Sequence, residues 1–236
     1  MIPLVVALWD RPGYQGPKRL VVEDTPSLDL LAFNDHPHAV GIHPGPDYDA
    51  WQQAHGQAPF AVLYDDNDYE GNGWIMTGGL PDIGPDALDF GGISSVRICP
   101  PITRDTVDRY ELGLIDLDNP GRDEFQTLDA TIAPIPLVVE LYVDAPFRGH
   151  RIVIVEHSAS LASDFGAEFA GNVSSVQVVA GPDYAGQSAM LWDGEGFTGR
   201  PIGLRLGSYP NLAWLGFDKK ARSISFTYSR PVITNP

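Results

Sequence analysis

The chain has 236 residues, of which 43% are hydrophobic and 10% aromatic, so it can bury a core and wholesale disorder is excluded. Its 25 glycines and 21 prolines favour many short strands joined by turns over long helices. The net charge of −16 repels phosphate backbones and anionic lipid headgroups. Composition therefore argues against a nucleic-acid-binding or membrane-surface protein and favours cations as ligands.

Cysteine usage and the start of the chain bear on the compartment. The single cysteine, Cys99, cannot form an internal disulfide, which is compatible with a reducing compartment. The first residues lack the positive charge of a secretory signal, and no stretch reaches the roughly 18 apolar residues of a membrane-spanning helix. These features predict a soluble, cytoplasmic protein.

A repeated pattern dominates the chain: an aromatic residue, four residues, a second aromatic, one residue and a glycine. Each copy follows a short apolar run typical of a strand, so we expect four β-hairpins whose bends need a glycine. The copies are Trp9/Tyr14/Gly16, Tyr64/Tyr69/Gly71, Tyr142/Phe147/Gly149 and Trp192/Phe197/Gly199.

Each copy is followed by a further predicted strand, at residues 39–42, 94–98, 174–178 and 222–226, and a short helical turn is expected at 49–54. The sequence Gly-Pro-Asp-Tyr occurs at 45–48 and again at 181–184, each time between the first and second copy of a pair. We therefore predict two domains of two motifs each, at 1–100 and 136–230, with 101–135 as a linker or accessory segment. Two such units can bury one apolar face against another, which predicts an all-β Greek-key sandwich.

The hairpin pattern, followed in the last copy by Ser-Tyr-Pro-Asn-Leu at 208–212 and Leu-Gly-Phe-Asp-Lys-Lys-Ala-Arg-Ser at 215–223, resembles the βγ-crystallin family. The resemblance covers all four motifs and leaves out 101–135. It implies two βγ-crystallin-like Greek-key β-sandwich domains. For microbial members it also implies calcium bound by paired Asn/Asp–Asn/Asp–x–x–Ser/Thr–Ser stretches that cross between the two motifs, which suits the six to eight oxygen ligands of Ca²⁺.

Transferred onto the first domain, the resemblance implies one complete calcium site. Asn34 and Asp35 retain the acid and amide positions, and Ser94 retains the hydroxyl of the crossing motif. The reciprocal combination of residues 90–91 with His38 has lost its donors. Without an ion, the Asn34-Asp35 pair is explained equally by an Asx turn ahead of a strand.

In the second domain the same transfer yields half a site. Asp218 and Ser174 supply oxygen, whereas Lys219 puts an ammonium where a second donor is expected, so weak or no binding is predicted there. The hairpin acids Asp10 and Asp65 could complete a calcium shell or be solvated loop charges.

Other candidate sites have simpler interpretations. The acidic hairpin 64–71 is either a loose surface cation site or a solvated turn, and it lacks the twelfth-position ligand of an EF-hand. The Gly-x-Gly-x-x-Gly at 194–199 coincides with the hairpin repeat, so it does not indicate a dinucleotide site. His36, His38 and His43 could hold a transition metal or lie in an exposed loop.

The sequence thus favours a non-enzymatic, calcium-binding or structural protein, since it contains no Gly-x-Ser-x-Gly, His-Glu-x-x-His, Cys-x-x-Cys or Walker motif. The alternative is an interaction protein without a calcium role, such as a protease inhibitor or toxin-like module. In that case 101–135 is the expected partner-binding segment.

Overall fold

The computed structural model describes residues 1–71, 73–76, 78–83, 92–100 and 134–227. The chain divides into two compact units, Met1–Ala133 and Pro134–Pro236, called unit 1 and unit 2 below. The predicted segment 101–135 lies outside the described residues except for Pro134 and Ile135, which are part of unit 2.

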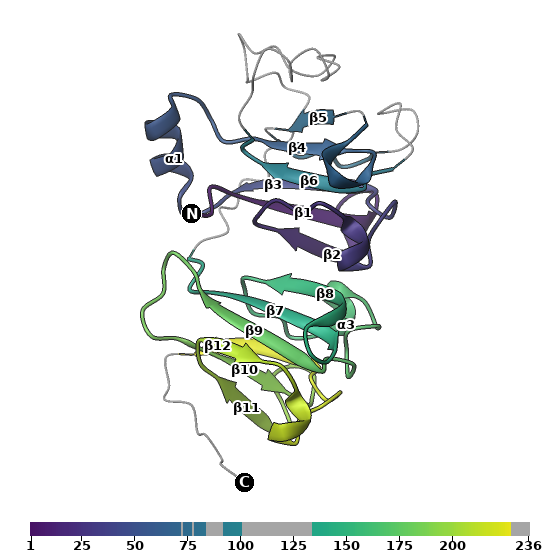
Figure 1. Cartoon of the computed structure of the whole chain (residues 1–236), viewed down its shortest axis with the longest axis vertical. Coiled ribbons are helices and arrows are strands. Elements are labelled where there is room, and N and C mark those ends of the chain that lie inside the picture. The colour runs from purple at the N-terminus through teal and green to yellow at the C-terminus, as the bar shows by residue number, and fades with distance from the viewer. Residues whose placement is uncertain (72, 77, 84–91, 101–133, 228–236) are drawn as a thin grey trace. The chain divides into compact units, whose positions relative to one another are not determined.

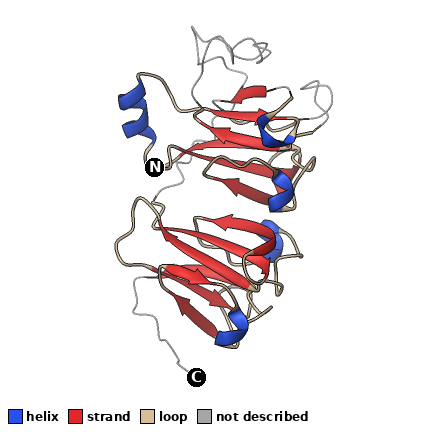
Figure 2. Cartoon of the chain, in the orientation of Figure 1, coloured by secondary structure: helices blue, strands red, loops and turns tan. Residues whose placement is uncertain are grey.

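Unit 1 contains two three-stranded antiparallel sheets, in the orders β2-β1-β3 and β5-β4-β6 (Figures 1 and 2). Its elements are β1 (Leu4–Arg11), β2 (Gln15–Val21), the 3-10 turn η1 (Leu28–Leu31), β3 (Ala39–Pro44), helix α1 (Tyr48–His55), β4 (Ala61–Tyr64), the 3-10 turn η2 (Asn67–Tyr69), β5 (Gly73–Met76) and β6 (Ser95–Ile98).

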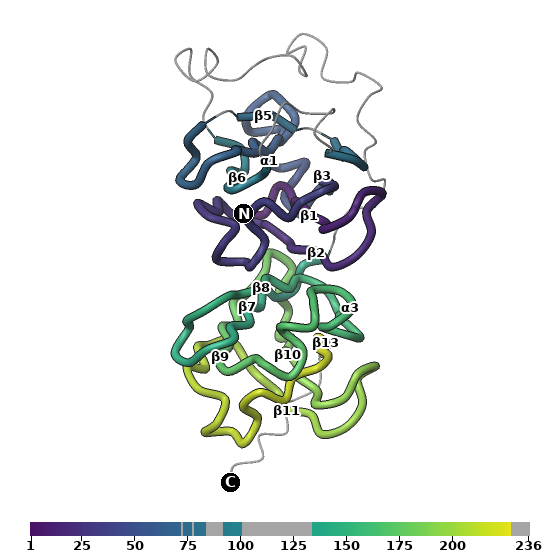
Figure 3. The backbone as a smooth tube through the Cα atoms, turned by 90° about the vertical axis from the view of Figure 1, so that its right-hand side faces the viewer, coloured from purple at the N-terminus to yellow at the C-terminus, as the bar shows by residue number. Residues whose placement is uncertain are grey.

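Unit 2 also has two antiparallel sheets, in the orders β12-β9-β7-β8 and β11-β10-β13. Figure 3 traces the backbone of the two units as a tube. Its elements are β7 (Leu137–Asp144), β8 (Arg148–Ile154), helix α3 (Leu161–Phe165), β9 (Ser175–Ala180), β10 (Ser188–Trp192), β11 (Pro201–Leu204), β12 (Gly207–Tyr209), the 3-10 turn η4 (Leu212–Leu215) and β13 (Ser223–Thr227). The prediction of an all-β chain is confirmed, and the predicted helical turn at 49–54 is α1.

Each motif sends one segment into the sheet of its partner motif, and this exchange completes the predicted Greek-key sandwich. Because the exchange is mutual, neither motif of a unit has a complete sheet without the other. The exchanged pairs are Thr25 with Val96, Leu80 with Val40, Ser158 with Ile224, and strand β12 with strand β9.

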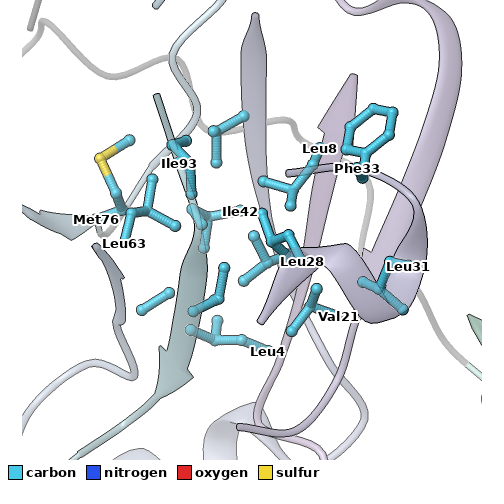
Figure 4. Close-up of a cluster of buried hydrophobic side chains, with 14 residues drawn as sticks. Leu4, Leu8, Val21, Leu28, Leu31, Phe33, Ile42, Leu63, Met76 and Ile93 are labelled. Atoms are coloured by element: carbon cyan, nitrogen blue, oxygen red, sulfur yellow. The ribbon is translucent and has the colours of Figure 1, made fainter. Parts of the chain in front are cut away.

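Apolar side chains from the facing sheets of each unit form its core, because alternate residues of a strand point to the same face. Figure 4 shows that Leu4 and Leu8 of β1 lie in one cluster with Leu63 of β4, Met76 of β5 and Ile93. All of these side chains are buried. Both units are therefore β-sandwiches with an interior of their own.

The Gly-Pro-Asp-Tyr repeat has the same structural role in both units. In unit 1 the Ile2 N–H donates to Asp47 Oδ2 at 2.5 Å, and the Ile2 carbonyl accepts from the Asp47 N–H at 3.2 Å. In unit 2 the same two bonds join Ile135 and Asp183, at 2.8 and 3.2 Å. The aspartate fixes the chain just before the first strand of each unit, which places Ile135 inside unit 2.

The four repeated glycines occupy equivalent bends, as predicted. Their φ angles are all left-handed, a region in which a Cβ is unfavourable. The values are +77° at Gly16, +74° at Gly71, +71° at Gly149 and +78° at Gly199.

The second aromatic residue of each hairpin is also left-handed, and in three motifs a buried serine holds it. Phe147 has φ +51°, and its N–H donates to Ser175 Oγ at 2.9 Å, while that hydroxyl donates to the Asp144 carbonyl at 2.7 Å. When the four motifs are numbered 1 to 4 in chain order, motif 1 has Ala39 at this position. The matching bonds are made by Ser95 with Tyr69 and Asp66, and by Ser223 with Phe197 and Gly194.

No helix in the described ranges is long and apolar enough to cross a membrane.

Helix α1 falls outside the four repeats and packs on the sheet through one aromatic side chain. Trp51 is buried and clusters with Phe60, Val62, Tyr64 and Ile75 on the β4 sheet.

Candidate calcium site

One backbone position has the same hydrogen bond in all four motifs and lies where the loops of the two motifs of a unit meet, which is called the crossing. It immediately precedes the strand that closes each motif, and its N–H donates to the carbonyl of that motif's first aromatic residue. The four bonds are His38 to Trp9 at 2.7 Å, Ser94 to Tyr64 at 2.8 Å, Ser174 to Tyr142 at 2.8 Å and Arg222 to Trp192 at 2.8 Å. These residues are therefore structurally equivalent, although their side chains are an imidazole, two hydroxyls and a guanidinium.

In unit 1 the structure brings the predicted donors Asp35 and Ser94 together. The Asp35 N–H donates to the Ile93 carbonyl at 3.2 Å, which pairs the two motifs through their backbones. The Ser94 hydroxyl lies 3.4 Å from Asp35 Oδ1. Ser94 is buried whereas Asp35 is exposed, so the carboxylate can reach solvent while the hydroxyl is fixed beneath it.

Backbone geometry explains the orientation of Asp35. Its φ of +55° is left-handed, a conformation that Asp tolerates better than most residues. Gly92 permits the close approach, because a Cβ at that position would overlap with Asp35 Oδ1. The turn thus directs one carboxylate across to the partner motif.

Asn34 lies beside Asp35, and its amide group contacts the Asp35 carboxylate. Its Nδ2 donates to Asp35 Oδ2 at 3.0 Å. Within the part of the chain that the structure describes, its Oδ1 is a buried oxygen without a hydrogen-bond donor. A buried acceptor without a donor carries a desolvation cost that a cation would offset. Carboxylate, amide and hydroxyl oxygens are the donor types that Ca²⁺ prefers, so these three side chains fit the ion.

The hairpin acid of the same motif as Ser94 points elsewhere. Asp65 follows Tyr64, whose carbonyl accepts the Ser94 N–H. However, the Asp65 side chain folds back over its own hairpin, since a Cβ on Gly71 would overlap with its Oδ1. In this position the carboxylate lies beside the bend glycine.

A comparison with unit 2 shows how the other hairpin acid differs. Asp193 Oδ1 accepts the N–H of Arg200, the residue after the bend glycine, at 2.6 Å. In motif 1 that residue is Pro17, which has no N–H to donate. Asp10 Oδ1 is consequently a buried oxygen without a hydrogen-bond partner in the described structure. Asp10 belongs to the hairpin whose Trp9 carbonyl accepts the His38 N–H, so it lies at the second crossing of unit 1 and not at the crossing that contains Ser94.

The crossing in unit 2 repeats the backbone of unit 1 with different chemistry. The Lys219 N–H donates to the Val173 carbonyl at 2.9 Å, and Lys219 has φ +53°. Lys219 therefore occupies the place of Asp35, beside the buried hydroxyl residue Ser174 and the half-buried Asp218. An ammonium group now extends from the position that carries the carboxylate in unit 1.

Each unit has a second crossing, in which the roles of the two motifs are exchanged. The described residues at these second crossings do not supply the paired oxygen donors. In unit 2 the Gly171 N–H donates to the Ala221 carbonyl at 2.7 Å, and a Cβ on Gly171 would lie 3.6 Å from Nη2 of Arg222. A guanidinium thus lies at this crossing. In unit 1 the matching residues 90–91 fall outside the described residues, and His38 is exposed.

The remaining candidates are the histidines and the glycine-rich stretch 194–199. No cluster of three or more His, Cys, Asp or Glu side chains suited to a metal occurs among the described residues. His43 is buried in β3, whereas His36 and His38 are exposed. The glycine-rich stretch 194–199 leads into strand β11 instead of a helix, as the hairpin interpretation predicted.

Cys99 is also unsuited to nucleophilic chemistry. Burial raises the pKa of its thiol to about 11. The thiol is therefore protonated near neutral pH, and the thiolate is the reactive form.

Two structural roles were not recognised in the sequence. The serine at the start of the closing strand holds the hairpin in three motifs, and Ser95, Ser175 and Ser223 could have been found by aligning the four motifs. The buried Arg19 in β2 had no signal beyond a basic residue within an apolar strand.

No family model and no curated protein matches the chain. Among solved structures, the chain is similar to a βγ-crystallin from Ciona intestinalis, with 27% identity, a TM-score of 0.32, and coverage of 38% of this chain and 99% of that one. A βγ-crystallin from an archaeon matches with 18% identity and a TM-score of 0.33 over 39% of this chain and 98% of that one. Protein S complexed with calcium matches with 14% identity and a TM-score of 0.33, over 94% of this chain and 99% of that one. Each unit is βγ-crystallin-like in fold, as its paired Greek-key motifs show directly.

Proposed function

We propose that this chain is a non-enzymatic, βγ-crystallin-like calcium-binding protein in which unit 1 binds one calcium ion and unit 2 binds none at its matching position. One observation carries the proposal. The Asp35 carboxylate and the buried Ser94 hydroxyl meet across the two motifs of unit 1, whereas Lys219 stands in the place of Asp35 in unit 2.

The donor set suits calcium better than a transition metal. Asp35, Asn34 and Ser94 offer hard oxygens, and backbone carbonyls and water can complete the shell of six to eight ligands. A single carboxylate in an exposed loop predicts modest affinity, because calcium affinity rises with the number of charged ligands.

Binding would cross-link the two motifs. Asp35 lies on the segment after η1, while Ser94 precedes β6, so an ion held by both joins parts of the chain far apart in sequence. A ligand that binds only the folded state stabilises it, by about 2.7 kcal/mol at a concentration 100 times its dissociation constant. The function proposed is therefore stabilisation of unit 1 by calcium.

Isothermal titration of CaCl₂ into the chelator-treated full chain tests the proposal, with Asp35→Asn and Lys219→Asn as matched variants. Asn tolerates the left-handed conformation at both positions, so neither substitution strains the turn. We expect one site in the parent protein, binding at least tenfold weaker in Asp35→Asn, a loss of about 1.4 kcal/mol, and no loss in Lys219→Asn. No heat of binding in the parent, or equal losses in both variants, would contradict the proposal.

A further inference from the structure

Arg19 is a cation buried against the core of unit 1. It lies in β2 opposite Leu8 of β1, and cross-strand neighbours share a face of the sheet, so its side chain points to the core side. Only 1% of the residue is exposed. A buried charge is costly unless it is well bonded. The contacts that offset this cost indicate what Arg19 does in the structure.

Two of these contacts hold the turn that precedes Asn34 and Asp35. Arg19 Nε donates to the Leu31 carbonyl at 2.6 Å, a buried bond. Its guanidinium also lies over the ring of Phe33, 4.8 Å from the centroid. The Arg19 side chain thus contacts the residues on both sides of Ala32.

Ala32 needs such support. It ends η1 in a left-handed conformation, with φ +52° and ψ +45°. Only glycine adopts this region without strain, because a Cβ approaches the following carbonyl. The strained residue lies two positions before Asn34, so the orientation of both proposed calcium ligands depends on this turn.

Motif 4 shows the same turn without strain and without the arginine. Its 3-10 turn η4 ends at Gly216 in the same left-handed conformation, with φ +65° and ψ +26°. Leu8 pairs with Arg19 just as Leu191 pairs with Ile202, so Ile202 is the equivalent of Arg19. The unstrained glycine turn thus coincides with an isoleucine, and the strained alanine turn with a buried arginine.

We propose that Arg19 is a positioning residue for the calcium site of unit 1, which holds the strained Ala32 turn so that Asn34 and Asp35 are presented to Ser94. This inference rests on the proposed function. A preorganised turn avoids ordering the loop on binding, which otherwise reduces affinity.

The direction of the effect separates positioning from simple electrostatics. Removing a positive charge near a cation site should by itself strengthen calcium binding. Loss of positioning should weaken it. A weaker site after removal of Arg19 therefore has the opposite sign to the charge effect.

The test uses the full chain with Arg19→Ile, Ala32→Gly and the double variant, titrated with CaCl₂. Ile is the residue at the equivalent place in motif 4, so the fold accommodates it. We expect Arg19→Ile to weaken binding about tenfold, which equals about 1.4 kcal/mol. We expect the double variant to regain parental affinity, because glycine removes the strain that Arg19 offsets.

Hydrogen exchange in the calcium-free protein provides a second readout. The amides of Ala32 and Phe33, bonded to Asp29 and Leu28, should exchange faster in Arg19→Ile, and those of Gly216 and Phe217 should not change. Should Arg19→Ile fail to fold, Arg19→Lys keeps the charge but lacks the planar donor, and the same amides report on it.

Two results would overturn the inference: unchanged or tighter calcium binding in Arg19→Ile, or unchanged exchange of the Ala32 and Phe33 amides. If the parent protein binds no calcium, the proposed function is contradicted instead. The exchange measurement then tests separately whether Arg19 stabilises the Ala32 turn.

Discussion

The crossing loops of the two units share a backbone and differ in charge. Asp35 and Lys219 have φ angles of +55° and +53° and donate their N–H groups to equivalent carbonyls, those of Ile93 and Val173. The hydroxyl position is a buried serine in both units, Ser94 and Ser174. One side chain, a carboxylate in one unit and an ammonium in the other, is the largest chemical difference between them.

This difference separates what maintains the fold from what can bind an ion. The paired loops are held by backbone hydrogen bonds, which do not depend on the side chain at position 35 or 219. Either charge is therefore compatible with the same Greek-key unit. Calcium binding, by contrast, depends on the sign of the charge, because two like charges 4 Å apart repel by about 4 kcal/mol at an effective dielectric constant of 20.

The largest expected effect comes from making unit 2 resemble unit 1. Lys219→Asp removes the ammonium and adds a carboxylate beside Ser174 and Asp218, so we expect a second calcium site per chain, with a dissociation constant of about 10⁻⁴ to 10⁻³ M. Lys219→Ala should help less, since it removes the repulsion without adding a ligand. Titration calorimetry gives the number of sites.

Lys220→Asp is the matched control, because it makes the same change of charge one residue away, where Nζ donates to the Gly216 carbonyl. A second site in that variant, or none in Lys219→Asp, would show that Lys219 is not what prevents binding in unit 2.

A smaller effect is expected from the serine braces, in which motif 1 differs from motif 3. Ser175→Ala leaves the Phe147 N–H and the Asp144 carbonyl without their partner and should cost about 1–3 kcal/mol of stability. Ala39→Ser supplies the missing hydroxyl to the Tyr14 hairpin and should add up to about 1 kcal/mol. Calorimetric unfolding measures both changes.

Ser163→Ala, on the exposed side of α3, is the control and should leave stability nearly unchanged. If Ser175→Ala costs no more than this control, the serine is not a brace and the motifs do not share this support.

The smallest effect concerns two glycines of the last hairpin, both with positive φ. Gly196 has φ +63°, and a Cβ added there would meet no atom within 4 Å, so Gly196→Ala should cost only the backbone term of about 1 kcal/mol. Gly199→Ala should cost about 1 kcal/mol more, because the Cβ displaces the Asp193 carboxylate from the Arg200 N–H. Equal unfolding free energies for the two variants would remove the special role of the repeated glycine.

Local patterns in the sequence predicted much of the fold. The hairpins were recognisable because both aromatics and the glycine lie within eight residues, and the structure gives all four glycines the expected conformation. The loops carrying Asn34, Asp35 and Ser94 were paired only through the resemblance to βγ-crystallins, and the 3.4 Å contact between Asp35 and Ser94 is a matter of three-dimensional geometry.

Contacts between distant residues escaped prediction. The serine brace joins Ser175 to Asp144, which are 31 residues apart, and Arg19 reaches Leu31 across the turn between strands. Neither residue type by itself indicates such a role, because serine is common ahead of strands and arginine is normally exposed. An alignment of the four motifs makes Ala39 and Arg19 visible as exceptions, and the structure shows which contacts each exception changes.

The most direct test of the central claim is a calcium titration of the full chain followed by amide resonances in ¹H–¹⁵N correlation spectra. We predict that calcium shifts the amides of Asp35, Ile93 and Ser94 and leaves those of Lys219, Val173 and Ser174 in place. Shifts of both sets, or of the unit 2 set alone, would contradict the assignment of a single calcium site to the crossing of unit 1.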